Sequence, residues 1–207
     1  MGSIGFTFAA GCGNTAIIIK LLSLGLDVDS RNNDGVTPLM IAVLNDKQNA
    51  FDILIQNNAN PSLKSNDGFS LLHFAAENGN TAIIMKLLSL GLDPDSRDND
   101  EVTPLMTPAG NDNQNVLDIL IQNGADPSAK DSRGFTLLHS AATFGNTAII
   151  MKLLSLGLDV DSRNNDWVTP LMTAAGKDKQ NAFDILIQNG TDPSLKSNNG
   201  FSLLHFA

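Results

Sequence analysis

Residues 134–150 read GFTLLHSAATFGNTAII, and residues 68–84 read GFSLLHFAAENGNTAII. The two stretches agree at most positions, including the whole of the closing GNTAII. From the earlier to the later copy the substitutions are Ser70 to Thr136, Phe74 to Ser140, Glu77 to Thr143 and Asn78 to Phe144. An unchanged apolar segment beside substituted positions indicates an internal duplication. It also raises the question of why a polar Asn has become an aromatic Phe.

The duplication belongs to a regular 33-residue period along the chain, which is the step from Gly35 to Gly68. A fixed period of this kind is typical of proteins built from stacked supersecondary repeats. The same turn glycine recurs at Gly134 and Gly200, whereas Glu101 and Trp167 hold that position in two other copies. We therefore predict a single domain over residues 1–207, with repeats at 2–34, 35–67, 68–100, 101–133, 134–166 and 167–199 and a partial repeat at 200–207.

Two kinds of repeat alternate along the chain. One kind carries Thr-Pro-Leu-Met, at residues 37–40, 103–106 and 169–172. The other kind carries Ser/Thr-Leu-Leu-His, at residues 70–73, 136–139 and 202–205. The duplicated element is therefore a tandem pair of repeats, one of each kind.

Each repeat predicts a polar turn followed by two short helices. Thr37 is a suitable N-cap, and Pro38 follows at the first helical position, where its missing N–H costs nothing. A second helix is expected to begin near Gln48 in one kind of repeat and to be capped by Asn80 in the other. The second helices carry one apolar stripe, which a repeat of two short helices cannot bury alone. Stacking of neighbouring repeats would bury it.

These features resemble the ankyrin-repeat family over essentially the whole chain. The period, the turn–helix–helix order, the Thr-Pro-Leu segments and the ending Gly124-Ala125-Asp126-Pro127 all match that family's pattern. The resemblance implies an all-α fold, an ankyrin-repeat solenoid of stacked helix–turn–helix units with β-turn fingers. It also implies a concave groove of first helices and fingers that binds partners, with the second helices on the convex back.

The chain departs from the family pattern in three ways. The family combines Pro and His in one tetrapeptide, whereas here the two residues alternate, so a hydrogen-bonded Thr–His pair is expected in alternate repeats only. Pro108 stands inside a first helix, where it should remove a backbone hydrogen bond or kink the helix. Glu101 and Trp167 occupy a turn position that usually requires the backbone freedom of glycine.

The composition limits the classes of partner and compartment. A chain of 207 residues with 42% hydrophobic and 17% charged residues is typical of a globular protein. The net charge of −9 argues against nucleic acid as a partner, because phosphate binding relies on clustered Lys and Arg. No apolar stretch approaches the ~20 residues of a membrane span. Cys12 is the single cysteine, which excludes an intrachain disulfide and fits a reducing, cytoplasmic location.

No pattern in the sequence indicates catalysis. His73, His139 and His205 recur at one repeat position, but they are two repeats apart and too distant to share a metal ion. The Asp-rich turn at residues 93–100 lacks the ligand order of a calcium-binding EF-hand. Motifs of phosphate-binding loops, serine hydrolases and zinc proteases are missing from the sequence. We therefore predict no enzymatic activity, no metal and no cofactor.

Differences between the copies point to a binding surface. Residues 79–93 and 145–159 are identical, whereas the ends of the first helices and the turn position vary. In the ankyrin fold those variable positions line the groove and the finger tips. The predicted partner contacts are Phe144, Trp167, Thr143, Glu101, Asn78, Glu77, Asn111, Lys177 and Asn45. Phe144 and Trp167 are the expected anchors, because aromatic residues are enriched at interface hot spots. The alternative for both rings is packing against a neighbouring repeat.

The sequence as a whole predicts a non-catalytic module that binds a partner protein on its groove and finger tips. One alternative is structural self-assembly, end to end, through uncapped terminal repeats with apolar residues such as Leu203, Leu204 and Phe206. Another is that the chain is a fragment of a larger multidomain ankyrin protein. No membrane partner is expected.

Overall fold

The computed structural model describes residues 2–110 and 113–206. It divides into two compact units, Met1–Asn99 and Asp100–Ala207, called unit 1 and unit 2 from here on. Short helices form the secondary structure of the described residues, where the strand-like pairings are two isolated β-bridges, Lys130 with Thr136 and Lys196 with Ser202. The predicted all-α repeat fold is therefore confirmed.

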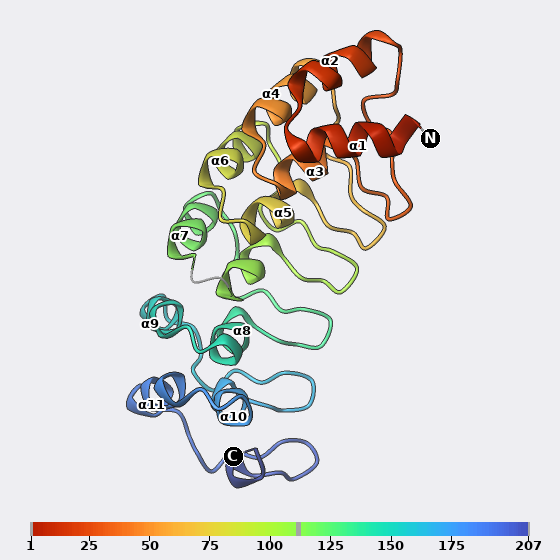
Figure 1. The fold of residues 1–207 in the computed structure, drawn as a ribbon. Coiled ribbons are helices and arrows are strands. Elements are labelled where there is room, and N and C mark those ends of the chain that lie inside the picture. The colour runs from red at the N-terminus through yellow and green to blue at the C-terminus, as the bar shows by residue number, and fades with distance from the viewer. Residues whose placement is uncertain (1, 111–112, 207) are drawn as a thin grey trace. The chain divides into compact units, whose positions relative to one another are not determined.

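Unit 1 contains three helix pairs. Its helices are α1 (Gly2–Cys12), α2 (Thr15–Ser23), α3 (Pro38–Leu44), α4 (Gln48–Gln56), α5 (Leu71–Glu77) and α6 (Thr81–Ser89). Figure 1 shows α1, α3 and α5 in one row and α2, α4 and α6 in a second row, with long turns extending from the first row. These turns are the fingers expected from the sequence.

Unit 2 repeats the same arrangement. Its elements are the 3-10 helix η1 (Pro104–Gly110), then α7 (Gln114–Gln122), α8 (Leu137–Phe144), α9 (Thr147–Ser155), α10 (Pro170–Gly176), α11 (Gln180–Gln188) and the 3-10 helix η2 (Leu203–His205). η1 stands where the matching repeats have the α-helices α3 and α10. Pro108 has no N–H to donate within η1, so the loss of α-helical geometry agrees with the disruption predicted there.

The helices begin at the predicted caps. The Thr37 hydroxyl accepts a hydrogen bond from the N–H of Met40 at 3.3 Å, with Pro38 at the first helical position. The Asn80 side chain accepts from the N–H of Ile83 at 2.9 Å. These contacts satisfy donors that the first turn of a helix leaves without a partner. The apolar stripe of the second helices is buried, as the fully buried Ile83, Ile84 and Leu87 of α6 illustrate.

His139 links its own helix cap to the next repeat. The Nδ1 atom accepts a hydrogen bond from the Thr136 N–H at 3.2 Å, and the Nε2 atom contacts the Val168 carbonyl oxygen at 2.9 Å. Because a carbonyl can only accept, Nε2 carries the proton and the ring is neutral. In the other kind of repeat, Met40 Sδ accepts from the Thr37 N–H at 3.4 Å. A thioether has no proton to donate, so Met reproduces the cap but not the link.

Backbone hydrogen bonds join each finger to the finger before it. In unit 1 the Asn66 N–H donates to the Asp34 carbonyl at 2.9 Å, and the Asn99 N–H donates to Asp67 at 3.0 Å. In unit 2 the corresponding donor–acceptor pairs are Ser132 to Asp100, Asn165 to Arg133 and Asn198 to Asp166, at 2.9 to 3.0 Å. The fingers are thus held in register by main-chain groups, which leaves their exposed side chains free to vary.

We expect acid to weaken unit 2 through His139. Burial lowers the pKa of this imidazole below its ordinary 6.5, although the Val168 carbonyl acts in the opposite direction. The unfolded chain therefore binds the proton more readily than the folded chain does. The stability that the neutral ring contributes is complete above about pH 6.5 and is lost progressively as the pH falls below that value.

The measurement is thermal unfolding by circular dichroism from about pH 7.5 to about pH 5.5. His139→Asn should lower the Tm at the higher pH and make the decline with acid shallower than in the wild type. His205→Asn is the matched control because His205 is exposed, and it should leave the decline unchanged. An equally steep decline in His139→Asn would show that another group senses the proton.

Candidate functional site

The structure places the predicted contact residues in several separate positions. Asn45, Glu77 and Asn78 are exposed in unit 1. Glu101, Thr143, Phe144, Trp167 and Lys177 belong to unit 2, and all of these except the half-buried Thr143 are exposed. Asn111 lies outside the described residues.

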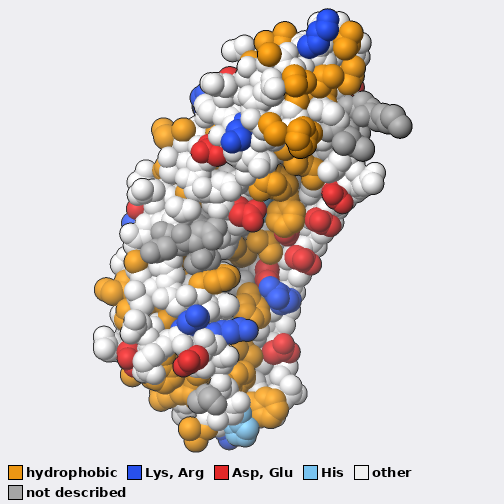
Figure 2. Space-filling model, in the orientation of Figure 1, with side chains coloured by type: hydrophobic (Ala, Val, Ile, Leu, Met, Phe, Trp, Pro, Cys, Tyr) orange, Lys and Arg blue, Asp and Glu red, His pale blue; other side chains and the backbone are white. Residues whose placement is uncertain are grey.

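A groove in unit 2 brings three of these residues together. Thr143, Phe144 and Lys177 line it with Met106, Arg133, Phe135 and Ser140, and its volume is about 440 Å³. We call it the Phe144 groove. Phe144 is the last residue of α8, and 56% of its surface is exposed. Figure 2 shows basic side chains beside exposed hydrophobic ones on unit 2, the combination that this groove presents.

One wall of the groove is an arginine that lies over a phenylalanine ring. The buried Asp131 carboxylate accepts hydrogen bonds from Arg133 Nε at 3.1 Å and from Arg133 Nη2 at 2.8 Å. The same carboxylate accepts from the N–H of Phe135 at 2.8 Å. The Arg133 guanidinium carbon then lies 5.0 Å from the centre of the Phe135 ring. Two bonds to one carboxylate fix the plane of a guanidinium, so Arg133 is oriented before any partner arrives.

Trp167 and Glu101 lie on finger turns and do not line the Phe144 groove. Trp167 is 53% exposed, and the guanidinium carbon of Arg163 lies 5.4 Å from its ring centre. Both residues adopt the left-handed backbone predicted to need glycine, with φ of 62° at Glu101 and 60° at Trp167. Conformations of this kind in a non-glycine residue cost on the order of 1–3 kcal/mol.

The side chain of Trp167 also alters the neighbouring finger. At the matching Gly134, an added Cβ would lie 2.5 Å from the Asn165 Oδ1 atom, where no atom fits. Asn165 can therefore reach back and donate to the Ser132 carbonyl at 3.1 Å. Next to Trp167, the corresponding Asn198 instead donates to the Asp166 carboxylate at 3.3 Å. Trp167 therefore changes two features of this turn. Its backbone is strained where glycine would not be, and the next finger's Asn side chain donates to a carboxylate instead of a main-chain carbonyl.

Two of the predicted polar residues of unit 1, Asn45 and Asn78, form hydrogen bonds that close helix ends. The Asn78 amide donates to the Leu44 carbonyl at 2.7 Å and to the Phe74 carbonyl at 3.1 Å, so it closes the ends of two first helices. The Asn45 amide donates to the Ile41 carbonyl at 2.9 Å. Phe144, which holds the position of Asn78 in the later copy, cannot donate these bonds. Asn78 therefore serves the fold, whereas Phe144 offers apolar surface.

Arg133, Phe135 and Ser140 are groove residues that are absent from the predicted contacts. Arg133 and Ser140 could have been found by comparing the copies, since they replace Asp67 and Phe74. The two hydrogen bonds from Arg133 to one oxygen of Asp131, which replaces Ser65, have no signal in the residue spacing. Their effect on Arg133 becomes visible only in three dimensions.

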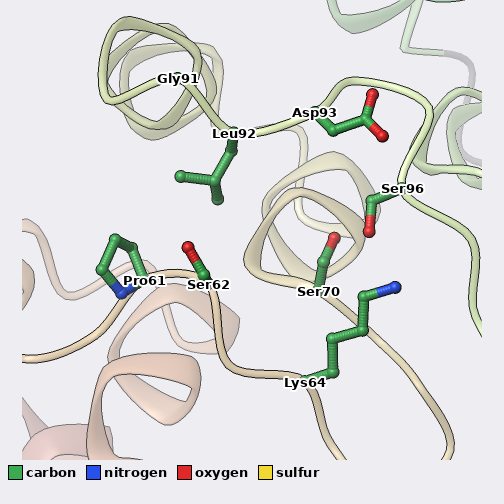
Figure 3. A pocket seen from close by; sticks show the side chains of 8 residues that line it. All are labelled: Pro61, Ser62, Lys64, Ser70, Gly91, Leu92, Asp93 and Ser96. Atoms are coloured by element: carbon green, nitrogen blue, oxygen red, sulfur yellow. The ribbon is translucent and has the colours of Figure 1, made fainter.

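Another pocket is lined by polar side chains that already form hydrogen bonds within the chain. In unit 1 it has a volume of about 290 Å³, and Figure 3 shows its side chains coming from a finger, from the cap of α5 and from the segment after α6. Lys64 Nζ donates to the Arg97 carbonyl at 2.7 Å, and the Ser70 hydroxyl contacts His73 Nδ1 at 2.8 Å. Its cation and its buried hydroxyl therefore already have partners.

No group of three or more His, Cys, Asp or Glu side chains among the described residues could hold a metal ion. Among the described helices, none combines the length and the apolar character needed to cross a membrane.

Comparison with known proteins identifies the class. A family model described as ankyrin repeats, in three copies, matches residues 5–65, 50–131, 72–164 and 138–207, and the chain belongs to this family. The structure of the human ASB11 ankyrin repeat domain superposes with a TM-score of 0.84 at 24% identity, covering 98% of this chain and 90% of that one. At this identity the likeness shows the fold alone. No curated protein matches the chain significantly. Ankyrin repeats are generally non-catalytic and generally serve as protein–protein interaction modules.

Replacing Trp167 by Gly should stabilise the protein. Glycine adopts a φ near 60° at little steric cost, and its lack of a Cβ restores the space beside Asn198. We expect the free energy of unfolding to rise by about 1 kcal/mol and the Tm by about 2–4 °C in a thermal melt. Glu101→Gly, at the same repeat position, should act in the same direction. A lower Tm for Trp167→Gly would mean that packing of the ring on Arg163 outweighs the backbone strain.

Proposed function

We propose that the chain binds a partner protein on unit 2, in the Phe144 groove and on the adjacent finger that carries Trp167. The exposure of Phe144 inside a groove carries this proposal. The earlier copy has at this position an Asn that closes helix ends, so the aromatic side chain supplies nothing that the repeat needs for folding. A half-exposed ring in a concave surface is a favourable interface anchor, because its burial on binding removes a large apolar area from water.

The geometry of the site supports binding to a largely pre-formed surface. The hydrogen bonds to Asp131 hold Arg133, and the main-chain bonds between fingers fix the turn that carries Trp167. Side chains that are already ordered lose little conformational entropy when a partner docks. Trp167 adds a second argument, because its strained backbone persists at a position where glycine would be easier. Strain of this kind concentrates at functional sites.

The test is a quantitative pull-down from a lysate of the source cells, read by mass spectrometry. Phe144→Ala and Trp167→Ala should each reduce captured partner about tenfold or more, since hot-spot truncations cost about 2 kcal/mol or more, while both keep a Tm near that of the wild type. Met151→Ala is the matched control, because Met151 is a comparably exposed apolar residue on the opposite row of helices. Unchanged capture by both aromatic variants would refute the proposed site.

Self-association is a second candidate function, favoured by the exposure of Leu204 in η2. This side chain is 86% exposed, and Phe201 beside it is 49% exposed. Light scattering against concentration would show growth in mass for the wild type that Leu204→Ser abolishes. A constant monomer mass over the whole range would remove this candidate.

A further inference from the structure

Unit 1 carries the earlier copy of several residues that line the Phe144 groove, and there an aromatic residue stands at the position of Ser140. Phe74 is the residue at the matching position of the earlier copy. Its ring centre lies 5.8 Å from that of Phe69, at an angle of 46°. In unit 2 the partner ring is retained as Phe135, but Ser140 ends in a hydroxyl and lines the groove instead of filling it.

The groove is large and apolar enough to accept the missing ring from outside. A cavity of about 150 Å³ suffices to hold benzene in a protein interior. The groove volume of about 440 Å³ leaves room for a ring and part of its backbone. An incoming ring would meet the aromatic rings of Phe135 and Phe144 and the thioether of Met106. Offset or edge-to-face contacts between rings and sulfur–ring contacts both favour an aromatic occupant.

The charges around this position differ between the two copies. Asp67 and Glu77 in unit 1 become Arg133 and Thr143 in unit 2. Lys177 adds an exposed cation to the lining of the groove. An acidic pair has thus been replaced by a hydroxyl and by the ion pair of Arg133 with Asp131, which itself replaces Ser65, and Lys177 adds a cation alongside. Carboxylates on a partner would be attracted to Lys177 and to the outer edge of Arg133, within the few ångströms over which such pairs act.

We propose that the Phe144 groove receives a Phe, Tyr or Trp side chain of a partner protein, flanked in the partner's sequence by Asp or Glu. The ring takes the place that Phe74 fills in unit 1, and the flanking carboxylates face Lys177 and Arg133. This inference rests on the function proposed above and names the chemistry of the segment that the groove selects. Because the chain carries a net charge of −9, the attraction is local, and at physiological salt the distant acidic residues are screened beyond about 8 Å.

The experiment selects binders from a displayed library of random dodecapeptides on the full chain at physiological ionic strength. Enriched peptides should share an aromatic residue with Asp or Glu close to it in sequence. Ser140→Phe rebuilds the residue that unit 1 carries and fills the groove, so it should weaken the selected peptides about tenfold or more while the Tm stays near that of the wild type. Ser155→Phe is the matched control, because it adds the same ring to an exposed position at the end of α9.

A charge exchange tests the second half of the proposal. Lys177→Glu should weaken the acidic peptides severalfold, and replacing their Asp or Glu by Lys should recover binding to that variant. Peptides without the aromatic–acidic pattern, or an empty selection, would overturn the inference. Binding that is lost in Phe144→Ala but unaffected by Ser140→Phe would overturn the ring position and leave the proposed function standing. Binding indifferent to both substitutions would overturn both.

Discussion

The hydrogen bonds between successive fingers are the constraint on which the rest of each unit depends. Their donors and acceptors are main-chain groups, such as the Asn66 N–H and the Asp34 carbonyl, so the contact requires a fixed number of residues between fingers rather than a particular side chain. A turn glycine permits the close approach of the next finger, because a Cβ at Gly35 would clash with the Asn66 Oδ1 atom. Trp167 keeps the main-chain bond, and the Asn198 side chain moves instead. Every non-proline residue offers the same main-chain donor and acceptor, which explains why the period is kept while exposed side chains change.

The two kinds of repeat divide the structural work between them. His139 caps its own helix and donates to the next finger at Val168, whereas Met40 reproduces the cap alone. Interfaces between neighbours therefore alternate in chemistry, and a single repeat is not equivalent to the one that follows it. The element that can be copied without disturbing any interface is the pair of repeats, which agrees with the sequence identity between residues 79–93 and 145–159. Nearest-neighbour contacts dominate the stability of such arrays.

The fold can be predicted from the sequence because the residues that indicate it lie close together in the chain. The caps at Thr37 and Asn80 and the disturbance around Pro108 follow from residue type and spacing alone, and the structure confirms them. The binding site is harder to predict from the sequence, because it depends on which side chains already form hydrogen bonds within the fold. Asn78 and Phe144 hold the same repeat position. The amide of Asn78 donates a hydrogen bond that closes a helix end, whereas the ring of Phe144 forms no such bond and is exposed. Neither that difference nor the separation of Trp167 from the Phe144 groove can be derived from spacing.

The identity of α6 and α9 has a genetic consequence. Both helices read TAIIMKLLS, and their flanking segments match as well. If the coding sequence is as similar as the two protein stretches, unequal crossing-over between them would add or delete one whole pair of repeats in frame. The seam would fall inside a second helix that reads the same in both copies, so the joined helix would keep its sequence. Recombination could thus multiply or remove whole grooves, and later substitutions at positions such as Ser140 and Phe144 would give each copy its own specificity.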